Sequence, residues 1–413
     1  MLFLIYALEL VVGYSLRYIN LRHLKIHGSE VPANFAGSID PDTLRKTSEY
    51  TFEQSRVGLI ESIADNILLV IFLFGGLMAV YDRWIGSVTN SLITCGILFF
   101  LVIYLAQSFL EIPFSLYQTF RIENRYGFNT MTIRLWITDF LKSAVISIIL
   151  IALLTGGAFL LIRLSPDLWW LWVWLFFAVV TLFLMYISPY VIEPLFFKFK
   201  PVSKEGLEDD IRDLLGKAGL EISRVMEVDA SRRSRHSNAY FTGIGRVKRI
   251  VLYDTLLEQM DNREILAILA HEAGHWKNHH IVKRLVLTEV GSLAVLYAAF
   301  RLLGWNGLPG LIGLENASLP AQLVILGFLG SLLGFFLTPL GSWLSRRHEW
   351  QADRFASELS GTPDALASAL IKLTRENLSN LHPHPLYAKI YYSHPPMVER
   401  VGRLLERQIH PRP

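Results

Sequence analysis

Two histidines and a glutamate stand at the spacing His-Glu-x-x-His in the stretch HEAGH, residues 271–275. His271 and His275 are four residues apart, so on a helix they project from one face, one turn apart. Two neutral imidazoles at this spacing can bind one Zn²⁺ at roughly 2.0 to 2.1 Å. Glu272, about 100° around the helix, can reach a water bound to the metal. Zinc lowers the pKa of this water to around 7, so Glu272 can accept its proton and later pass that proton to the leaving amine. The motif therefore predicts metal-assisted hydrolysis.

A third ligand is expected on another element, because catalytic zinc sites use three protein ligands and leave one position to water. The stretch SRRHEWQADRFASEL, residues 345–359, has helical periodicity and places Glu349 and Asp353 on one face. One carboxylate can bind the metal while the other orients a ligand imidazole from behind. Arg346, one turn before Glu349, could steady that carboxylate. Taken alone, such a stretch is more typical of a solvated face beside the membrane.

The helix that must carry the first motif begins in DNREILAILAHEAGHWKNHH. Asp261 with Glu264 three residues on predicts a capping box, and the apolar residues that follow have helical spacing. His279 and His280, after the motif, are expected to be solvated residues at the end of this helix.

Other short elements surround this helix in the sequence. KEGLEDDIRDLLGKAGL predicts an amphipathic helix that stops at Gly219. Its apolar face is formed by Leu207, Ile211, Leu214 and Leu215. Three stretches rich in β-branched and aromatic residues, 223–230, 238–245 and 249–257, predict a small sheet.

Composition indicates a membrane protein. The 413 residues are 52% hydrophobic and 18% charged, which is unusual for a water-soluble chain. Seven apolar segments are long enough to cross a bilayer, which takes about 20 helical residues. They are residues 2–19, 59–81, 89–110, 140–163, 168–191, 284–304 and 320–343. The single cysteine, Cys95, excludes a disulfide or cysteine metal site within one chain, and a net charge of +3 is too small to indicate a nucleic-acid partner.

Arginine and lysine alternate between the loops. They gather after spans one, three and five and in the C-terminal tail. The other loops hold almost none: Arg83 after span two, Arg163 after span four and Arg301 after span six. The positive-inside rule then places the N-terminus outside and the C-terminus in the cytoplasm.

The same alternation divides the chain into four parts. Residues 195–282 and 345–413 are expected to form two parts of one cytoplasmic catalytic unit. Residues 1–194 hold spans one to five, and residues 283–344 hold spans six and seven.

HEAGH, followed beyond another span by SRRHEWQAD, resembles the integral-membrane zinc metalloproteases of the CAAX prenyl protease 1 family, whose pattern is HExxH with a distal SRxxExxAD. ENRYGFNTMT at 123–132, SNAYFTG at 237–243 and SHPPMVERV at 393–401 are similar to family segments in the same order. The resemblance implies a mainly α, polytopic membrane protein with seven transmembrane helices around a water-filled chamber. A gluzincin-like α+β catalytic unit closes one end. It also implies zinc-dependent endoproteolysis, with removal of the last three residues after a prenylated cysteine as the namesake activity.

The resemblance implies a role for each matching residue of the metal site. One zinc per chain is bound by His271, His275 and Glu349, with Glu272 as the general base. Asp353 does not bind the metal but orients a ligand imidazole from behind.

The resemblance also implies how substrate is held. His394 is expected near the scissile carbonyl, where it could stabilise an oxyanion, with Arg400 as a supporting arginine. An edge strand that pairs with the substrate backbone is matched by Asn238, Ala239 and Tyr240.

The chamber would also accommodate acidic residues in or at the ends of spans, since a charge facing lipid is unfavourable. These residues are Glu9, Glu61, Asp65, Glu111 and Glu193. They are expected to face water, or one another in helix contacts.

Departures from the family bear on host and substrate. The chain is shorter than typical eukaryotic members, and RQIHPRP has no dilysine-like ER retrieval signal. A bacterial cytoplasmic membrane is therefore favoured over the ER, and the partner is a peptide or protein, prenylated or not.

Two alternative functions stay open. One is a membrane quality-control protease of the heat-shock type, against which seven spans argue. The other is a transporter or binding protein with a vestigial zinc site, against which an intact Glu272 argues.

Overall fold

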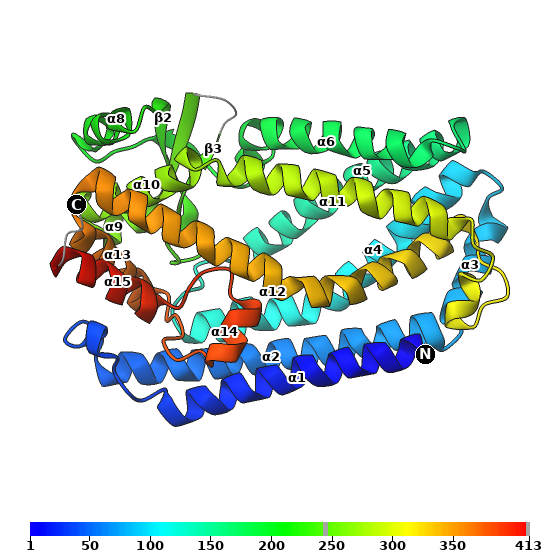
Figure 1. The fold of residues 1–413 in the computed structure, drawn as a ribbon, viewed down its shortest axis with the longest axis horizontal. Helices are drawn as coiled ribbons and strands as arrows, with labels where there is room; N and C mark the ends of the chain where they lie inside the picture. The colour runs from blue at the N-terminus through cyan, green and yellow to red at the C-terminus, as the bar shows by residue number, and fades with distance from the viewer. Residues whose placement is uncertain (243–246, 410–413) are drawn as a thin grey trace.

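A ring of seven long helices makes up most of the protein (Figure 1). The computed structural model describes residues 1–242 and 247–409, and within them seven helices are long and apolar enough to cross a membrane. They are Leu2–His27 (α1), Pro41–Phe74 (α2), Leu92–Tyr117 (α4) with its π-helical continuation Gln118–Glu123 (η2), Ile133–Leu164 (α5), Trp169–Val191 (α6), His280–Leu303 (α11) and Leu319–Ser360 (α12). Each overlaps one of the predicted segments, so the predicted set of spans is confirmed.

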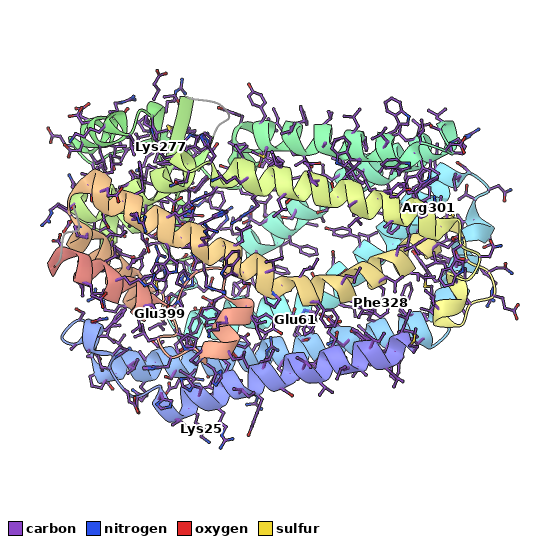
Figure 2. The ribbon with its side chains drawn as sticks, in the orientation of Figure 1. Lys25, Glu61, Lys277, Arg301, Phe328 and Glu399 are labelled. Atoms are coloured by element: carbon purple, nitrogen blue, oxygen red, sulfur yellow. The ribbon has the colours of Figure 1, made fainter. Side chains whose placement is uncertain are left out.

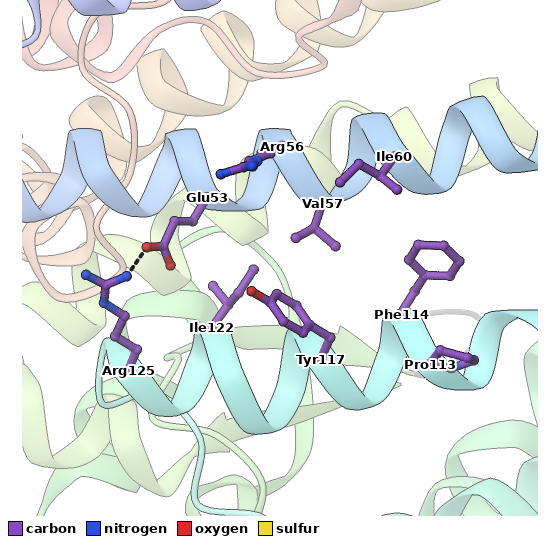
Figure 3. Close-up of a pocket in the computed structure, with 9 residues that line it drawn as sticks. All are labelled: Glu53, Arg56, Val57, Ile60, Pro113, Phe114, Tyr117, Ile122 and Arg125. Atoms are coloured by element: carbon purple, nitrogen blue, oxygen red, sulfur yellow. Dashed lines mark hydrogen bonds and ion pairs between the residues drawn. The ribbon is translucent and has the colours of Figure 1, made fainter.

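The ring closes through contacts between neighbours. The order of packing is α1, α2, α4 with η2, α5, α6, α11, α12 and back to α1. Only 0% to 17% of the most apolar window of each helix is buried inside the protein, so most of this surface is left for lipid. Cavities of about 610 and 320 Å³ lie among the ring helices, the larger between α2 and α4 where Glu53 pairs with Arg125 (Figure 3).

The second span differs from its predicted bounds. Gly75 ends α2, and Gly76 with φ 81° turns the chain into a separate helix, Leu77–Val88 (α3). The predicted segment 59–81 runs across this break, because the apolar run continues through residues that can adopt the left-handed conformation. The helix also starts at Pro41, well before its apolar part, since polar residues continue it beyond the membrane.

A four-stranded sheet lies at one end of the ring (Figure 1). The strands are Phe199–Pro201 (β1), Glu221–Val228 (β2), Ala239–Thr242 (β3) and Val247–Tyr253 (β4), in the order β1-β2-β4-β3. Strands β2 and β4 are parallel and the other pairs are antiparallel. The small predicted sheet is confirmed, with residues 243–245 of its second stretch outside the described residues. Strand β1 was not predicted, because three residues are too few to show a strand pattern.

Helices pack on the sheet and complete this unit. The amphipathic helix Leu207–Lys217 (α8) buries the predicted apolar face, and Gly219 ends it with φ 73°. The remaining helices are Glu193–Phe196 (α7), Asp254–Gln259 (α9), Asn262–Lys277 (α10), Pro363–Glu376 (α13), Pro385–Tyr391 (α14) and Met397–Ile409 (α15), with short 3₁₀ turns at Ala33–Phe35 (η1), Ala230–Arg232 (η3) and Pro309–Ile312 (η4).

The motif helix α10 starts where the sequence predicts. The side chain of Asp261 accepts from the backbone N–H of Glu264, and Glu264 accepts from that of Asp261, a complete capping box. The buried Glu264 also accepts from Ser368 and Lys372 of α13, each at 2.7 Å. The start of α10 is therefore fixed by a second helix.

The third-ligand stretch and the seventh span form one helix. Helix α12 runs unbroken for 42 residues from Leu319 to Ser360. It carries the apolar span at its start and Glu349 and Asp353 near its end.

Basic residues of different loops lie at the two ends of the ring. In Figure 2, Lys25 and Lys277 lie at the end that holds the sheet, Arg301 lies at the other end, and Glu61 lies between them. The 3₁₀ turn after α1 contacts α15, and η4 contacts α12. Segments expected on one side of the membrane therefore share one end of the molecule.

A histidine contact ties the sheet end to the ring. Nε2 of His236 is 3.3 Å from Oε2 of Glu123 in η2, and Nδ1 is 2.9 Å from Oδ1 of Asn377. The His236 ring also stacks on Phe128, with 4.2 Å between ring centres. The bond to Glu123 raises the pKa of His236 above its usual 6.5, although burial lowers it.

The contact predicts a pH-dependent stability. A raised pKa in the folded protein means that the charged pair contributes fully below about pH 6.5 and is lost as pH rises through the folded-state pKa. We expect the melting temperature of the detergent-solubilised protein to exceed that of a His236→Gln variant most at about pH 5.5, and least at about pH 8.5. A difference that stays constant across this range would contradict the assignment.

Candidate metal centre

Helices α10 and α12 cross with their backbones in close approach at Gly274. A Cβ at this position would lie 2.8 Å from Cα and 3.0 Å from the carbonyl oxygen of Ala352. Such distances are shorter than carbon contacts allow, so only glycine permits this crossing. Gly274 directly precedes His275, and Ala352 directly precedes Asp353. The crossing therefore sets the separation between the imidazoles and the carboxylates.

Three side chains converge at the crossing: His271 and His275 from α10 and Glu349 from α12. The two Nε2 atoms are 3.2 Å apart. Nε2 of His275 is 3.2 Å from Oε1 of Glu349, and Nε2 of His271 is 3.5 Å from Oε2. Ligand atoms placed at about 2.0 to 2.1 Å from a tetrahedral zinc ion stand about 3.3 Å apart. The spacing of the cluster therefore fits zinc.

The donor chemistry of the cluster also requires a cation. Nδ1 of His271 is 2.8 Å from Oδ1 of Asp353, and this partner assigns the ring proton to Nδ1. Nε2 then presents a lone pair, as do the oxygens of Glu349. Oε2 of Glu349 is buried without a hydrogen-bond partner among the described residues, although Nδ1 of His394 is 2.9 Å away. Converging lone pairs in a buried place are unfavourable unless a cation binds them, so these residues fit a metal ion.

Asp353 and Arg400 form a buried pair behind the cluster. Arg400 donates to both oxygens of Asp353, at 2.9 Å from Nε and 2.6 Å from Nη2, and each residue is 4% exposed. Nη1 of Arg400 is also 3.4 Å from Oε2 of Glu349. Burial lowers the pKa of His271, but its bonds to Asp353 and Glu349 outweigh this effect and raise the pKa to about 9. The carboxylates thus stabilise positive charge at the imidazole.

Glu272 and His394 are less buried than Glu349 and Asp353. Glu272 follows His271 on α10, is partly exposed, and interacts electrostatically with Arg400. The His394 side chain is 58% exposed and comes from the segment between α14 and α15. Both side chains are therefore at least partly open to solvent, and His394 also contacts the cluster through Glu349.

Arg346 has other hydrogen-bond partners than the expected Glu349. Its guanidinium donates to three backbone carbonyls at the C-terminal end of α14, and the carboxylate is contacted by Arg400 instead. The acceptors are the carbonyls of Ala388 at 3.2 Å, Lys389 at 2.9 Å and Tyr392 at 2.6 Å. Since His394 follows two residues after Tyr392, Arg346 fixes the segment that leads to His394.

His280 belongs to the site, and the expectation that it is solvated is wrong. It is 3% exposed, and its Nδ1 is 3.1 Å from Nδ1 of His275. The neighbouring His279 is exposed, as expected, and its φ of 54° turns the chain from α10 into α11. No helical spacing relates His280 to the motif, because the helix ends before this turn.

The three residues expected to bind substrate lie beside α10. Ala239 and Tyr240 belong to β3, the last strand in the sheet order, and Asn238 precedes them. The carbonyl of Asn238 accepts from the backbone N–H of Tyr253 at 3.1 Å, so pairing with β4 starts here. The Tyr240 hydroxyl donates to Oε2 of Glu193 at 2.9 Å. Strand β3 contacts α10, which places a strand edge next to the motif.

Known proteins share this arrangement. A family model described as CAAX prenyl protease N-terminal, five membrane helices, matches residues 20–198, and the model of peptidase family M48 matches residues 201–408. The chain is 33% identical to the CAAX prenyl protease 1 homolog of Arabidopsis thaliana, over 95% of this chain and 96% of that protein. It is 31% identical to CAAX prenyl protease 1 of Saccharomyces cerevisiae, over 93% and 90%. The crystal structure of S. mikatae Ste24p matches with a TM-score of 0.88 at 28% identity, over 98% of both chains.

A His-Glu-x-x-His helix joined to a ring of membrane helices defines an integral-membrane metallopeptidase. The matches make the assignment specific. The chain belongs to peptidase family M48 and carries the five-helix N-terminal region of the CAAX prenyl proteases. The resemblance seen in the sequence is confirmed, together with the mainly α fold and its small sheet.

The helix crossing predicts that Gly274→Ala damages the metal centre. The added methyl group must push α10 away from Ala352, so we expect about 1–3 kcal/mol lower stability and at least about tenfold weaker zinc binding. Chelator competition and thermal unfolding measure both effects. Gly341→Ala on α12 is the matched control, because a Cβ there meets nothing within 4 Å. Equal zinc affinity in the two variants would refute the role of the crossing.

The buried pair predicts a large effect of Arg400→Gln. Asp353 would keep its charge in a buried place without the guanidinium, with His271 as its remaining partner, which lowers the free energy of unfolding by about 3–5 kcal/mol. Arg403→Gln, one turn along α15, removes an exposed guanidinium that lies 3.9 Å over the Trp350 ring, and should change it by about 0.5–1 kcal/mol. Denaturant unfolding compares the two, and similar losses would contradict the assignment.

Proposed function

We propose that this protein is a membrane zinc metalloendopeptidase that hydrolyses a peptide bond near the C-terminus of CAAX proteins or peptides, prenylated or not. The observation that carries the proposal is the convergence of His271, His275 and Glu349 at the spacing of a zinc site. Relatives that match almost the whole chain and are named CAAX prenyl proteases support the substrate class. One zinc per chain, held by these three residues, would polarise the scissile carbonyl and acidify a water.

Glu272 is the proposed general base. It takes a proton from the attacking water and returns it to the leaving amine. Its position one residue after a ligand and its partial exposure support this role. Asp353 holds the Nδ1 proton of His271, and Arg400 balances the charge of Asp353 and Glu349.

His394 is the proposed donor to the oxyanion that forms on the scissile carbonyl. Its exposed imidazole is held at the rim of the cluster by the contact with Glu349. Arg346 supports this placement indirectly, through the carbonyls at the end of α14.

The substrate is proposed to bind as an added strand beside β3, along Asn238, Ala239 and Tyr240. Main-chain pairing suits an extended C-terminal tail and requires no particular side chains. The place of β3 at the end of the strand order and its contact with α10 support this mode.

The protein is proposed to lie in the lipid bilayer with residues 195–282 and 345–413 as one catalytic unit in the cytoplasm. Residues 1–194 and 283–344 supply its membrane helices. The place of Lys25 and Lys277 at the sheet end supports this orientation under the positive-inside rule. The relatives named above come from eukaryotes, so a bacterial cytoplasmic membrane stays a prediction.

The matches favour this function over the two alternatives. They cover nearly the whole chain and name CAAX prenyl proteases rather than a heat-shock protease or a transporter.

Cleavage of a farnesylated C-terminal peptide by the purified, detergent-solubilised protein tests the proposal. We expect release of the last three residues, measured by mass spectrometry. The release should be lost after chelation and reduced by at least about a hundredfold in Glu272→Gln. The variant should still bind one zinc per chain, because it keeps all three ligands.

The unfarnesylated peptide serves as the matched substrate. Equal cleavage of both peptides would show that the prenyl group is not recognised. Undiminished cleavage by Glu272→Gln would overturn the assigned base.

A further inference from the structure

We propose that His280 is a positioning residue of the metal centre, which fixes the tautomer and orientation of the ligand His275. The inference rests on the proposed zinc site. It assigns a role to a buried histidine outside the motif that carries the chemistry.

The contacts form a chain of three groups. Nδ1 of His275 is 3.1 Å from Nδ1 of His280, and Nε2 of His280 is 2.8 Å from Oε1 of Gln351. His275 is on α10, His280 is the first residue of α11, and Gln351 is on α12. Three helices therefore meet through one hydrogen-bonded line.

The amide oxygen at one end of this line determines which nitrogen donates in each of its hydrogen bonds. The amide oxygen of Gln351 can only accept, so the proton of a neutral His280 is on Nε2. Nδ1 of His280 then has a lone pair and accepts from Nδ1–H of His275. The remaining ring nitrogen of His275, Nε2, must face Glu349 with its lone pair free. This is the tautomer that a metal ligand requires.

Packing holds His280 in this role. It is 3% exposed, and its ring stacks on that of His348, with 4.0 Å between centres and 10° between planes. The left-handed turn at His279 is what returns the chain so that His280 faces α10. Left-handed backbone at a non-glycine residue is uncommon and is maintained here by these contacts.

The two ligand histidines thus receive different support. His271 donates to the carboxylate of Asp353, whereas His275 donates to a neutral imidazole. A carboxylate behind both would add a further buried negative charge to those of Glu349 and Asp353.

Zinc affinity in matched variants tests the inference. His280→Asn keeps an acceptor oxygen close to the place of Nδ1, whereas His280→Leu has nearly the same size and no acceptor. We expect the leucine variant to bind zinc about 10–100-fold more weakly than wild type, and the asparagine variant to stay within about threefold. Competition with a chromophoric chelator on the detergent-solubilised full chain measures both constants, and melting of the metal-free proteins reports folding.

A role in packing alone predicts a different order. His280→Phe, which preserves an aromatic ring but cannot accept, would then bind zinc as wild type does, and asparagine and leucine would be equally weak. Either result overturns the inference.

His275→Ala separates this inference from the proposed zinc site. If His275→Ala loses zinc while His280→Leu keeps it, only the role of His280 fails. If His275→Ala also binds zinc as wild type does, the zinc site itself is refuted.

Discussion

The crossing of α10 and α12 at Gly274 is the constraint on which the rest of the site depends. Its backbone separation is smaller than any side chain allows, and Ala352 on the facing helix is fully buried. Because every ligand atom comes from one of these two helices, their separation decides whether the histidines and the carboxylates share one ion. The bonds of Glu264 to α13 hold the other end of α10, so the crossing angle is fixed at two points.

Charge balance is the second condition that the fold satisfies. Glu349 and Asp353 are 3% and 4% exposed, and one arginine lies between them. Two buried carboxylates with a single guanidinium favour a further positive charge, which a proton on His271 or a metal ion supplies. The same groups that bind the cation therefore make its absence unfavourable, and this couples metal binding to folding.

The sequence carried information where the pattern is local. The capping box at Asp261, the face of α8 and the apolar spans all follow from spacing within one element, and the structure has them where they are expected. Contacts that depend on a turn between elements have no such signal. His280 is reached only through the left-handed residue His279, and the partners of Arg346 lie about forty residues further along the chain. The end of α2 at Gly75 was not predicted for a related reason: hydropathy stays high across Gly75 and Gly76, although the chain changes direction there.

The length of α12 has a consequence for how this protein can be divided. At about 1.5 Å per residue, the part of α12 from Leu319 to Glu349 runs about 45 Å along the helix, from the far end of the ring to the metal centre, and Pro339 lies within it. Glu349 thus lies on the same continuous helix as the seventh membrane span, and His280 is the first residue of the helix that forms the sixth span. A fragment containing only the sheet and α10 would lack both, so the peptidase cannot be separated from its membrane anchor as a free-standing module. A mismatch between these spans and the bilayer, which such helices accommodate by tilting or kinking, would therefore act on the same helices that carry Glu349 and His280.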